Sequence, residues 1–193
     1  MRSMLWTAAL LFLGGCTTYG AIYSPITDDS AVDLPDVVGT WTTEQPLDDS
    51  SPLFIDIVPW PYGDYEYDVT MRDTTEVFGE LEVRVAEFGG TLVVAALPGE
   101  NELKGTVLPL YQFYRLRPSA GDTLFVDALE PERLRELLGS EDDTSAALSL
   151  ERGDPDILFL ATASDLAEVF AAHADEEELW TNASDATVFV RVP

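Results

Sequence analysis

The clearest structural signal in the sequence is the run Asp64-Tyr65-Glu66-Tyr67-Asp68-Val69-Thr70-Met71-Arg72. Its apolar residues alternate without a break with acids, threonine and arginine. Because successive side chains of a β-strand point to opposite faces of the sheet, this pattern predicts a strand with one buried and one solvated face. Half-solvated strands are typical of antiparallel sheets, so the stretch indicates an antiparallel, mainly β protein.

Similar patterns continue along the chain. Leucine and valine alternate with charged residues over 81–85, and Gly89-Gly90 suits a hairpin turn into the next strand, 91–97. Further strands are expected at 53–58, 108–116, 123–129, 146–151, 157–161 and 187–192. So many short strands with few helices predict an antiparallel meander curled into a barrel or a sandwich, because antiparallel sheets dispose of their exposed edges in these ways.

Two short α-helices are expected between the strands. The first covers 130–138, with Pro131 in its first turn and Gly139 directly after it. The second covers 165–173, where Thr162 and Asp165 have the spacing of a capping box.

The tripeptide Gly39-Thr40-Trp41, near the start of the first strand, resembles the Gly-x-Trp motif of lipocalins and related small barrels. In that family the tryptophan plugs the closed end of the barrel beneath an apolar ligand cavity. Together with the strand pattern, the resemblance predicts a lipocalin-like or incomplete β-barrel with two short α-helices.

The amino terminus has the layout of a secretory signal. Arg2 precedes a mainly apolar run, 4–13, and small residues follow. A membrane-spanning helix needs about 20 apolar residues, so this run is too short to remain as an anchor. The residues Leu13-Gly14-Gly15-Cys16 resemble the lipobox of bacterial lipoproteins. The resemblance implies a diacylglyceryl thioether on Cys16, cleavage before it, and acylation of the new amino terminus, for example with palmitate.

The chain is therefore expected to have three parts. These are a lipoprotein signal peptide over 1–15, the lipidated Cys16 with a flexible tether over 16–36, and a single β-rich domain over 37–193. Thr17 follows the cysteine, whereas Asp at that position retains lipoproteins in the inner membrane of many Gram-negative bacteria. The outer membrane is thus favoured, at either its periplasmic face or the cell surface.

Acidic residues dominate the charge, with 36 Asp and Glu against 10 Lys and Arg and a net charge of −26. Such a surface repels phosphate backbones, which excludes nucleic acid as a partner. Two explanations of the charge stay open. It keeps the protein soluble, for example in a salty habitat, or it binds cations or a basic partner protein.

The residues that carry most enzyme chemistry are scarce. Cys16 is the only cysteine and His173 the only histidine, and no serine lies in a Gly-x-Ser-x-Gly elbow. We therefore expect no enzyme, no cofactor and no bound metal. The alternative is a carboxylate-based hydrolase of envelope glycans, which needs two acids facing each other in a cleft. Asp64, Glu66 and Asp68 are its candidates, although they share the solvated face of their strand.

Aromatic residues are the best candidates for a binding site. The segment 59–65 places Trp60 and Tyr62 beside prolines and ends in Tyr65, and large rigid rings of this kind are common at interfaces. The expected ligand-binding residues are Trp41, Trp60, Tyr62, Tyr65, Tyr67, Tyr111 and Phe113. The leading hypothesis is a non-enzymatic envelope lipoprotein that binds a small apolar ligand or a protein partner. A filled barrel interior instead favours a structural or assembly accessory of the cell envelope.

Overall fold

The computed structural model of the 193-residue chain describes residues 19–44, 52–61, 66–99, 110–119, 122–139, 147–152, 154–181 and 186–193. For Phe78 and for residues 147–152 and 154–156 it describes the backbone only. Within these ranges, no helix combines the length and the apolar character that crossing a bilayer requires.

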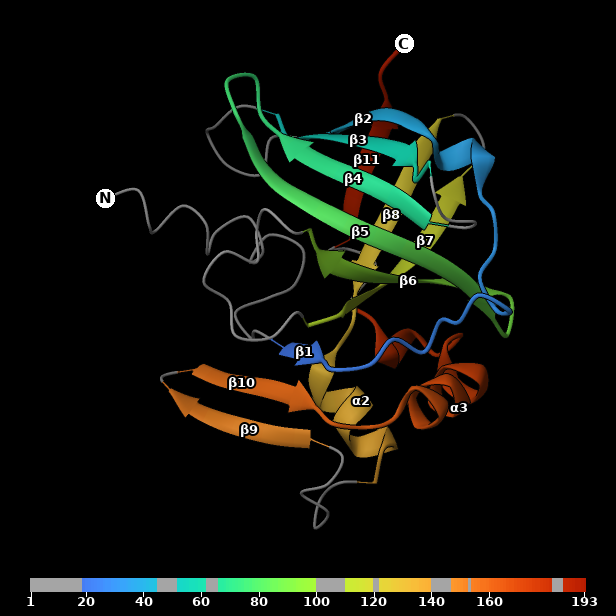
Figure 1. The fold of residues 1–193 in the computed structure, drawn as a ribbon, viewed down its shortest axis with the longest axis vertical. Coiled ribbons are helices and arrows are strands. Elements are labelled where there is room, and N and C mark those ends of the chain that lie inside the picture. Colours follow the sequence, from blue (N-terminus) through green and yellow to red (C-terminus); the bar gives the residue numbers. More distant parts are fainter. Residues whose placement is uncertain are drawn as a thin grey trace.

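Eight of the described strands form a closed antiparallel barrel (Figure 1). In sheet order they are β11 (Thr187–Arg191), β2 (Gly39–Thr43), β3 (Phe54–Pro59), β4 (Glu66–Arg72), β5 (Val77–Phe88), β6 (Thr91–Pro98), β7 (Gln112–Ser119) and β8 (Thr123–Ala128). The barrel closes because β11 pairs with β2 on one side and with β8 on the other. The mainly β fold class is confirmed, and the barrel is complete rather than incomplete.

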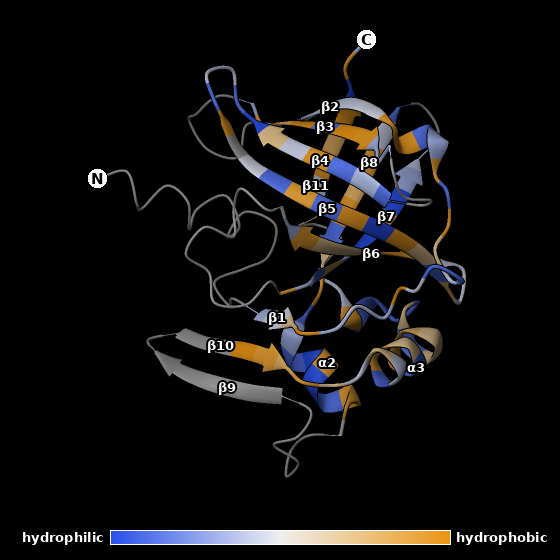
Figure 2. Ribbon diagram, in the orientation of Figure 1, coloured by the Kyte–Doolittle hydropathy of each residue, from blue (hydrophilic) through white to orange (hydrophobic). Residues whose placement is uncertain are grey.

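The strand with the clearest signal in the sequence, β4, lies where the alternation predicts it. Tyr67 and Met71 of β4 are buried, whereas Asp68 and Thr70 between them are partly exposed. The predicted hairpin after β5 is also confirmed, because Gly89 and Gly90 form the turn and Phe88 pairs with Thr91. Figure 2 shows the alternation of hydrophilic and hydrophobic residues along β4 and β5.

A second layer packs against the outside of the barrel (Figure 1). It contains a three-stranded sheet in the order β1 (Tyr19–Ala21), β10 (Asp154–Phe159) and β9 (Ala147–Arg152). It also contains two short α-helices, α2 (Pro131–Leu137) and α3 (Ala163–His173), in the described part of the chain. Apart from β1, these elements lie in the sequence between β8 and β11, so they form an insertion between the last two strands of the barrel.

Both predicted helices are present, with bounds close to those expected. The capping box of α3 is complete, since Asp165 N donates to Thr162 Oγ1 at 3.2 Å and Thr162 N donates to Asp165 Oδ2 at 3.1 Å. The helix buries Leu166 and Phe170 against the barrel. Its last residue, His173, lies 2.7 Å from Glu176 through Nδ1 and Oε1.

The tether expected over 16–36 is corrected by the structure from Tyr19 onward. β1 pairs in parallel with β10, and an antiparallel bridge joins Ala21 to Tyr111. Tyr19, Ala21 and Ile26 are buried in the second core. Pairing and burial hold this segment in place, so the folded domain begins well before Val37. Residues 16–18 lie outside the described residues.

The two layers give the molecule two hydrophobic cores, which share the wall formed by β5, β6 and β7. Val94 and Ala96 of β6 belong to the core inside the barrel, whereas Val93 and Ala95 belong to the core outside it. The unbroken apolar run of this strand is thereby explained, because both of its faces are buried. In the outer core Phe170 contacts Phe113 edge-on, with a centroid distance of 5.4 Å, and stacks on Trp180 at 6.1 Å.

Candidate ligand cavity

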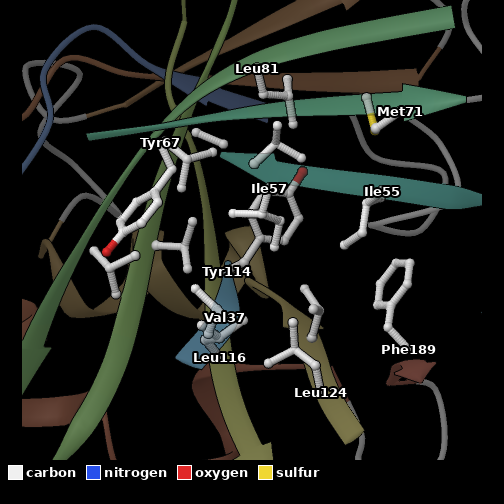
Figure 3. Close-up of a pocket in the computed structure, with 16 residues that line it drawn as sticks. Val37, Ile55, Ile57, Tyr67, Met71, Leu81, Tyr114, Leu116, Leu124 and Phe189 are labelled. Carbon is white, nitrogen blue, oxygen red and sulfur yellow. The ribbon is translucent and has the colours of Figure 1, made fainter. Parts of the chain in front are cut away.

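The barrel interior contains a cavity of about 90 Å³ (Figure 3). All of the side chains that line it are aliphatic or aromatic. They are Val37, Ile55, Ile57, Tyr67, Val69, Met71, Leu81, Val83, Val85, Val94, Ala96, Tyr114, Leu116, Leu124, Val126 and Phe189. Most come in pairs or triplets spaced two apart on one strand, because alternate residues of a strand point into the lumen.

The two polar groups of the lining are already hydrogen-bonded. The Tyr67 hydroxyl donates to Asp33 Oδ1 at 2.7 Å and accepts from the backbone N–H of Leu34 at 2.6 Å. The Tyr114 hydroxyl donates to Gln112 Oε1 at 2.6 Å. Burial raises the pKa of both tyrosines, so each keeps its proton. The lining therefore offers an apolar surface with its hydroxyl groups occupied.

The segment between β1 and β2 crosses one end of the barrel. Val32 N donates to the carbonyl of Val85 at 2.8 Å, and the short 3-10 helix Pro35–Val37 then brings Val37 into the lining of the cavity. The indole N–H of Trp41 donates to the carbonyl of Val37 at 2.8 Å. These hydrogen bonds hold the segment in place, so that it closes the cavity at the end where β2 begins.

The tripeptide Gly39-Thr40-Trp41 has a clear structural role at this end. The Arg191 guanidinium lies over the Trp41 ring, 4.3 Å from its centroid, and donates to the carbonyls of Val38 and Asp36. A Cβ at Gly39 would lie 2.7 Å from Arg191 Nη1, and the Gly39 φ of +139° disfavours residues with a side chain. Glycine at this position thus makes room for an arginine that covers the tryptophan.

The seven aromatic residues expected to bind ligand fall into different places. Tyr67 lines the cavity, and Trp41 belongs to the same core without appearing in the lining. Phe113 and Tyr111 lie on the other side of the barrel wall, in or against the outer core. Trp60 follows β3 and is 38% exposed. Tyr62 and Tyr65 lie outside the described residues.

Most of the cavity residues are aliphatic, whereas the residues expected from the sequence to bind ligand are all aromatic. The aliphatic lining was therefore not predicted. The signal that could have found them is the alternation itself. In β5 it places Leu81, Val83 and Val85 on one face, and all three line the lumen. Tyr114 was also missed, since it is adjacent to Phe113 and only the register decides which of the two points inward.

Two of the acids considered for glycan hydrolysis, Glu66 and Asp68, lie on the outer face of β4. Glu66 accepts from Arg84 Nε at 2.7 Å, which ties this carboxylate to the neighbouring strand. Burial, Glu80 and Glu66 together raise the pKa of Asp68. Asp64 lies outside the described residues. Across the described ranges, no three His, Cys, Asp or Glu residues are grouped so that they could hold a metal ion.

Comparison with known proteins gives no relative for this chain: no family model, no curated protein and no solved structure matches it.

Proposed function

We propose that the protein is a lipid-anchored envelope lipoprotein whose barrel binds a small, uncharged apolar molecule. The observation that carries the binding proposal is the cavity inside the closed barrel, because its lining is apolar throughout and its two hydroxyl groups are engaged elsewhere. Apolar cavities accept apolar guests.

The charge of the ligand follows from the lining. A buried carboxylate or ammonium group is costly without a partner of opposite charge. The lining contains no charged residue, and the protein carries a net charge of −26. A fatty acid in its ionised form is therefore disfavoured, and a neutral hydrocarbon, alcohol or comparable apolar molecule is favoured.

The size of the cavity limits the ligand. An engineered apolar cavity of about 150 Å³ binds benzene or xenon. At about 90 Å³ the cavity described here suits an atom or molecule smaller than benzene, or one end of a slender chain. Filling it restores the van der Waals contacts that the lining side chains lack on the cavity side.

The binding proposal is tested with xenon, benzene and n-hexanol as probes of increasing size. Xenon is expected to bind the wild type and to shift the methyl resonances of Val69 and Val126, which line the cavity. Val69→Phe fills the lumen and is expected to abolish this binding. Val58→Phe is the matched control, because Val58 is 49% exposed and lies outside the lumen. Equal xenon binding by Val69→Phe and the wild type, or no binding by the wild type, contradicts the proposal.

The lipid anchor is tested separately. Mass spectrometry of the protein purified from host membranes is expected to show an amino terminus at Cys16 that carries acyl chains. An intact Met1, or cleavage at another residue, contradicts this part. The same sample also tests the ligand, since native mass spectrometry would detect a neutral molecule that leaves on unfolding.

The small volume of the cavity favours a second function, that of a structural accessory of the cell envelope with a largely filled barrel. On this alternative Val69→Phe perturbs only stability, and no probe binds the wild type.

A further inference from the structure

One residue next to the cavity lining has no side chain. Gly79 of β5 is paired with Met71 of β4, and it lies on the same face of β5 as Leu81 and Val83. A Cβ added at Gly79 would overlap the terminal Cε methyl of Met71. The methionine methyl therefore occupies the place that any other residue at position 79 would fill.

Met71 has a glycine as its paired neighbour on one side and a bulky residue on the other. On the other side of β4 its paired neighbour is Ile55, a bulky residue that also lines the cavity. Methionine has three flexible side-chain bonds and adapts readily to its surroundings. The methyl can thus lie over Gly79, or it can point into the lumen. Figure 3 places Met71 and Tyr67 at opposite ends of the cavity, so Met71 borders the end away from Tyr67.

We propose that Met71 determines which size of ligand the cavity admits and that Gly79 provides the space in which the Met71 methyl lies. With the methyl on Gly79 the lumen is free for a ligand. A side chain at position 79 drives the methyl into the lumen and shuts the ligand out. This inference rests on the proposed function, because it assigns the size limit of the same apolar site to one residue pair.

The position of the Met71 methyl over Gly79 is tested first, without any ligand. Met1, Met4 and Met71 are the methionines of the chain, so Met71 is the only one in the mature protein that begins at Cys16. Methionine labelled at its methyl carbon then gives one NMR signal. In the wild type this methyl is expected to show contacts to the α-protons of Gly79. In Gly79→Ala it is expected to show contacts to lumen methyls such as those of Val126 on β8. Absence of the Gly79 contact in the wild type overturns the proposal.

The consequence for binding is tested with xenon on three variants. Gly79→Ala is expected to weaken xenon binding by about tenfold or more, since one methyl-sized group in an apolar pocket has effects of that order. Gly79→Ala combined with Met71→Val is expected to restore binding, because the shorter side chain at position 71 takes up less of the lumen. Gly99→Ala is the control and is expected to bind as the wild type does, because its nearest contacts are with Glu80 rather than with the lining.

These outcomes separate the two proposals. If the double variant binds as weakly as Gly79→Ala alone, Met71 is not the group that blocks the lumen, and the further inference fails while the cavity remains a binding site. If no probe binds even the wild type, the proposed function fails. The contacts of the labelled methyl still show whether Met71 sits on Gly79.

Discussion

Asp127 and Arg115 form an ion pair inside the protein, on the outer wall of the barrel. The Asp127 side chain is completely buried and accepts from Arg115 Nε at 2.8 Å and from Arg117 Nε at 2.7 Å. Arg115 also donates to both carboxylate oxygens of Glu177 at 2.9 Å, and its guanidinium lies over the ring of Trp180. Because Glu177 and Trp180 belong to the insertion, Arg115 fastens the insertion to the barrel.

Replacing Asp127 by Asn is expected to lower the free energy of unfolding by about 3 kcal/mol or more, because it leaves the buried arginine without its full counter-charge. Urea unfolding followed by tryptophan fluorescence measures the change. Asp122→Asn is the matched control: Asp122 pairs with Arg191 at the surface, so its loss is expected to cost less than about 1 kcal/mol. Equal losses of unfolding free energy in the two variants would show that the buried ion pair contributes no more to stability than the surface pair.

The same pair predicts how stability responds to acid. Burial alone would raise the pKa of Asp127, but the hydrogen bonds from Arg117 and Arg115 outweigh burial and lower it. The unfolded chain then binds the proton more readily than the folded one. The contribution of the pair is complete above about pH 4, the ordinary value, and is lost as the pH falls through the lower pKa of the folded state. The stability difference between the wild type and Asp127→Asn is thus expected to shrink below about pH 4. A difference that stays constant with pH speaks against this origin.

Gly39→Ala is expected to lower stability by about 2 kcal/mol, because it combines a disfavoured backbone angle with displacement of Arg191 from Trp41. Gly90→Ala separates the two causes. Gly90 also has a positive φ, of 88°, but nothing lies within 4 Å of an added Cβ, so its loss is expected to be about 1 kcal/mol. Thermal unfolding of both variants gives the comparison. A smaller loss for Gly39→Ala than for Gly90→Ala would mean that the arginine moves at no cost.

Tyr19→Phe tests whether β1 belongs to the core. The Tyr19 hydroxyl donates to the carbonyl of Phe113 at 2.8 Å and accepts from its N–H at 3.2 Å. Burial raises the pKa of Tyr19 well above its ordinary value, so the hydroxyl keeps its proton. Its removal is expected to cost about 1–3 kcal/mol in urea unfolding. Tyr23→Phe, at a side chain that is 50% exposed, is expected to change stability by less than about 0.5 kcal/mol.

Local pattern predicted the elements of the fold but not their partners. The alternation within β4 and the capping residues Thr162 and Asp165 depend on neighbours in sequence, and both are found in the structure. The strands 146–151 and 157–161 were also expected, but as β9 and β10 they form a separate sheet with β1 outside the barrel, in which β10 lies between the other two. Pairing between strands that are far apart in the sequence depends on which apolar sheet faces can be buried against other elements. A single sequence does not show this.

The site was predicted less well than the fold, for a related reason. Tyr67 was chosen correctly as a residue on the inner face of β4, whereas Phe113 packs on the outside of the barrel. In a strand buried on both faces, hydrophobicity no longer separates inside from outside. Tyr19 was overlooked because three residues are too few to show a period, and the burial of β1 depends on contacts with Phe113 and β10.

The position of β1 close to Cys16 limits how far the folded domain can lie from that residue. Only Thr17 and Thr18 separate Cys16 from Tyr19, and an extended chain advances at most about 3.6 Å per residue, or about 11 Å over this interval. If Cys16 carries acyl chains, the domain lies directly against the lipid headgroups, because no long flexible linker separates it from the membrane. Exchange of a bound molecule is then confined to the leaflet that holds the anchor and to proteins lying in or close against it.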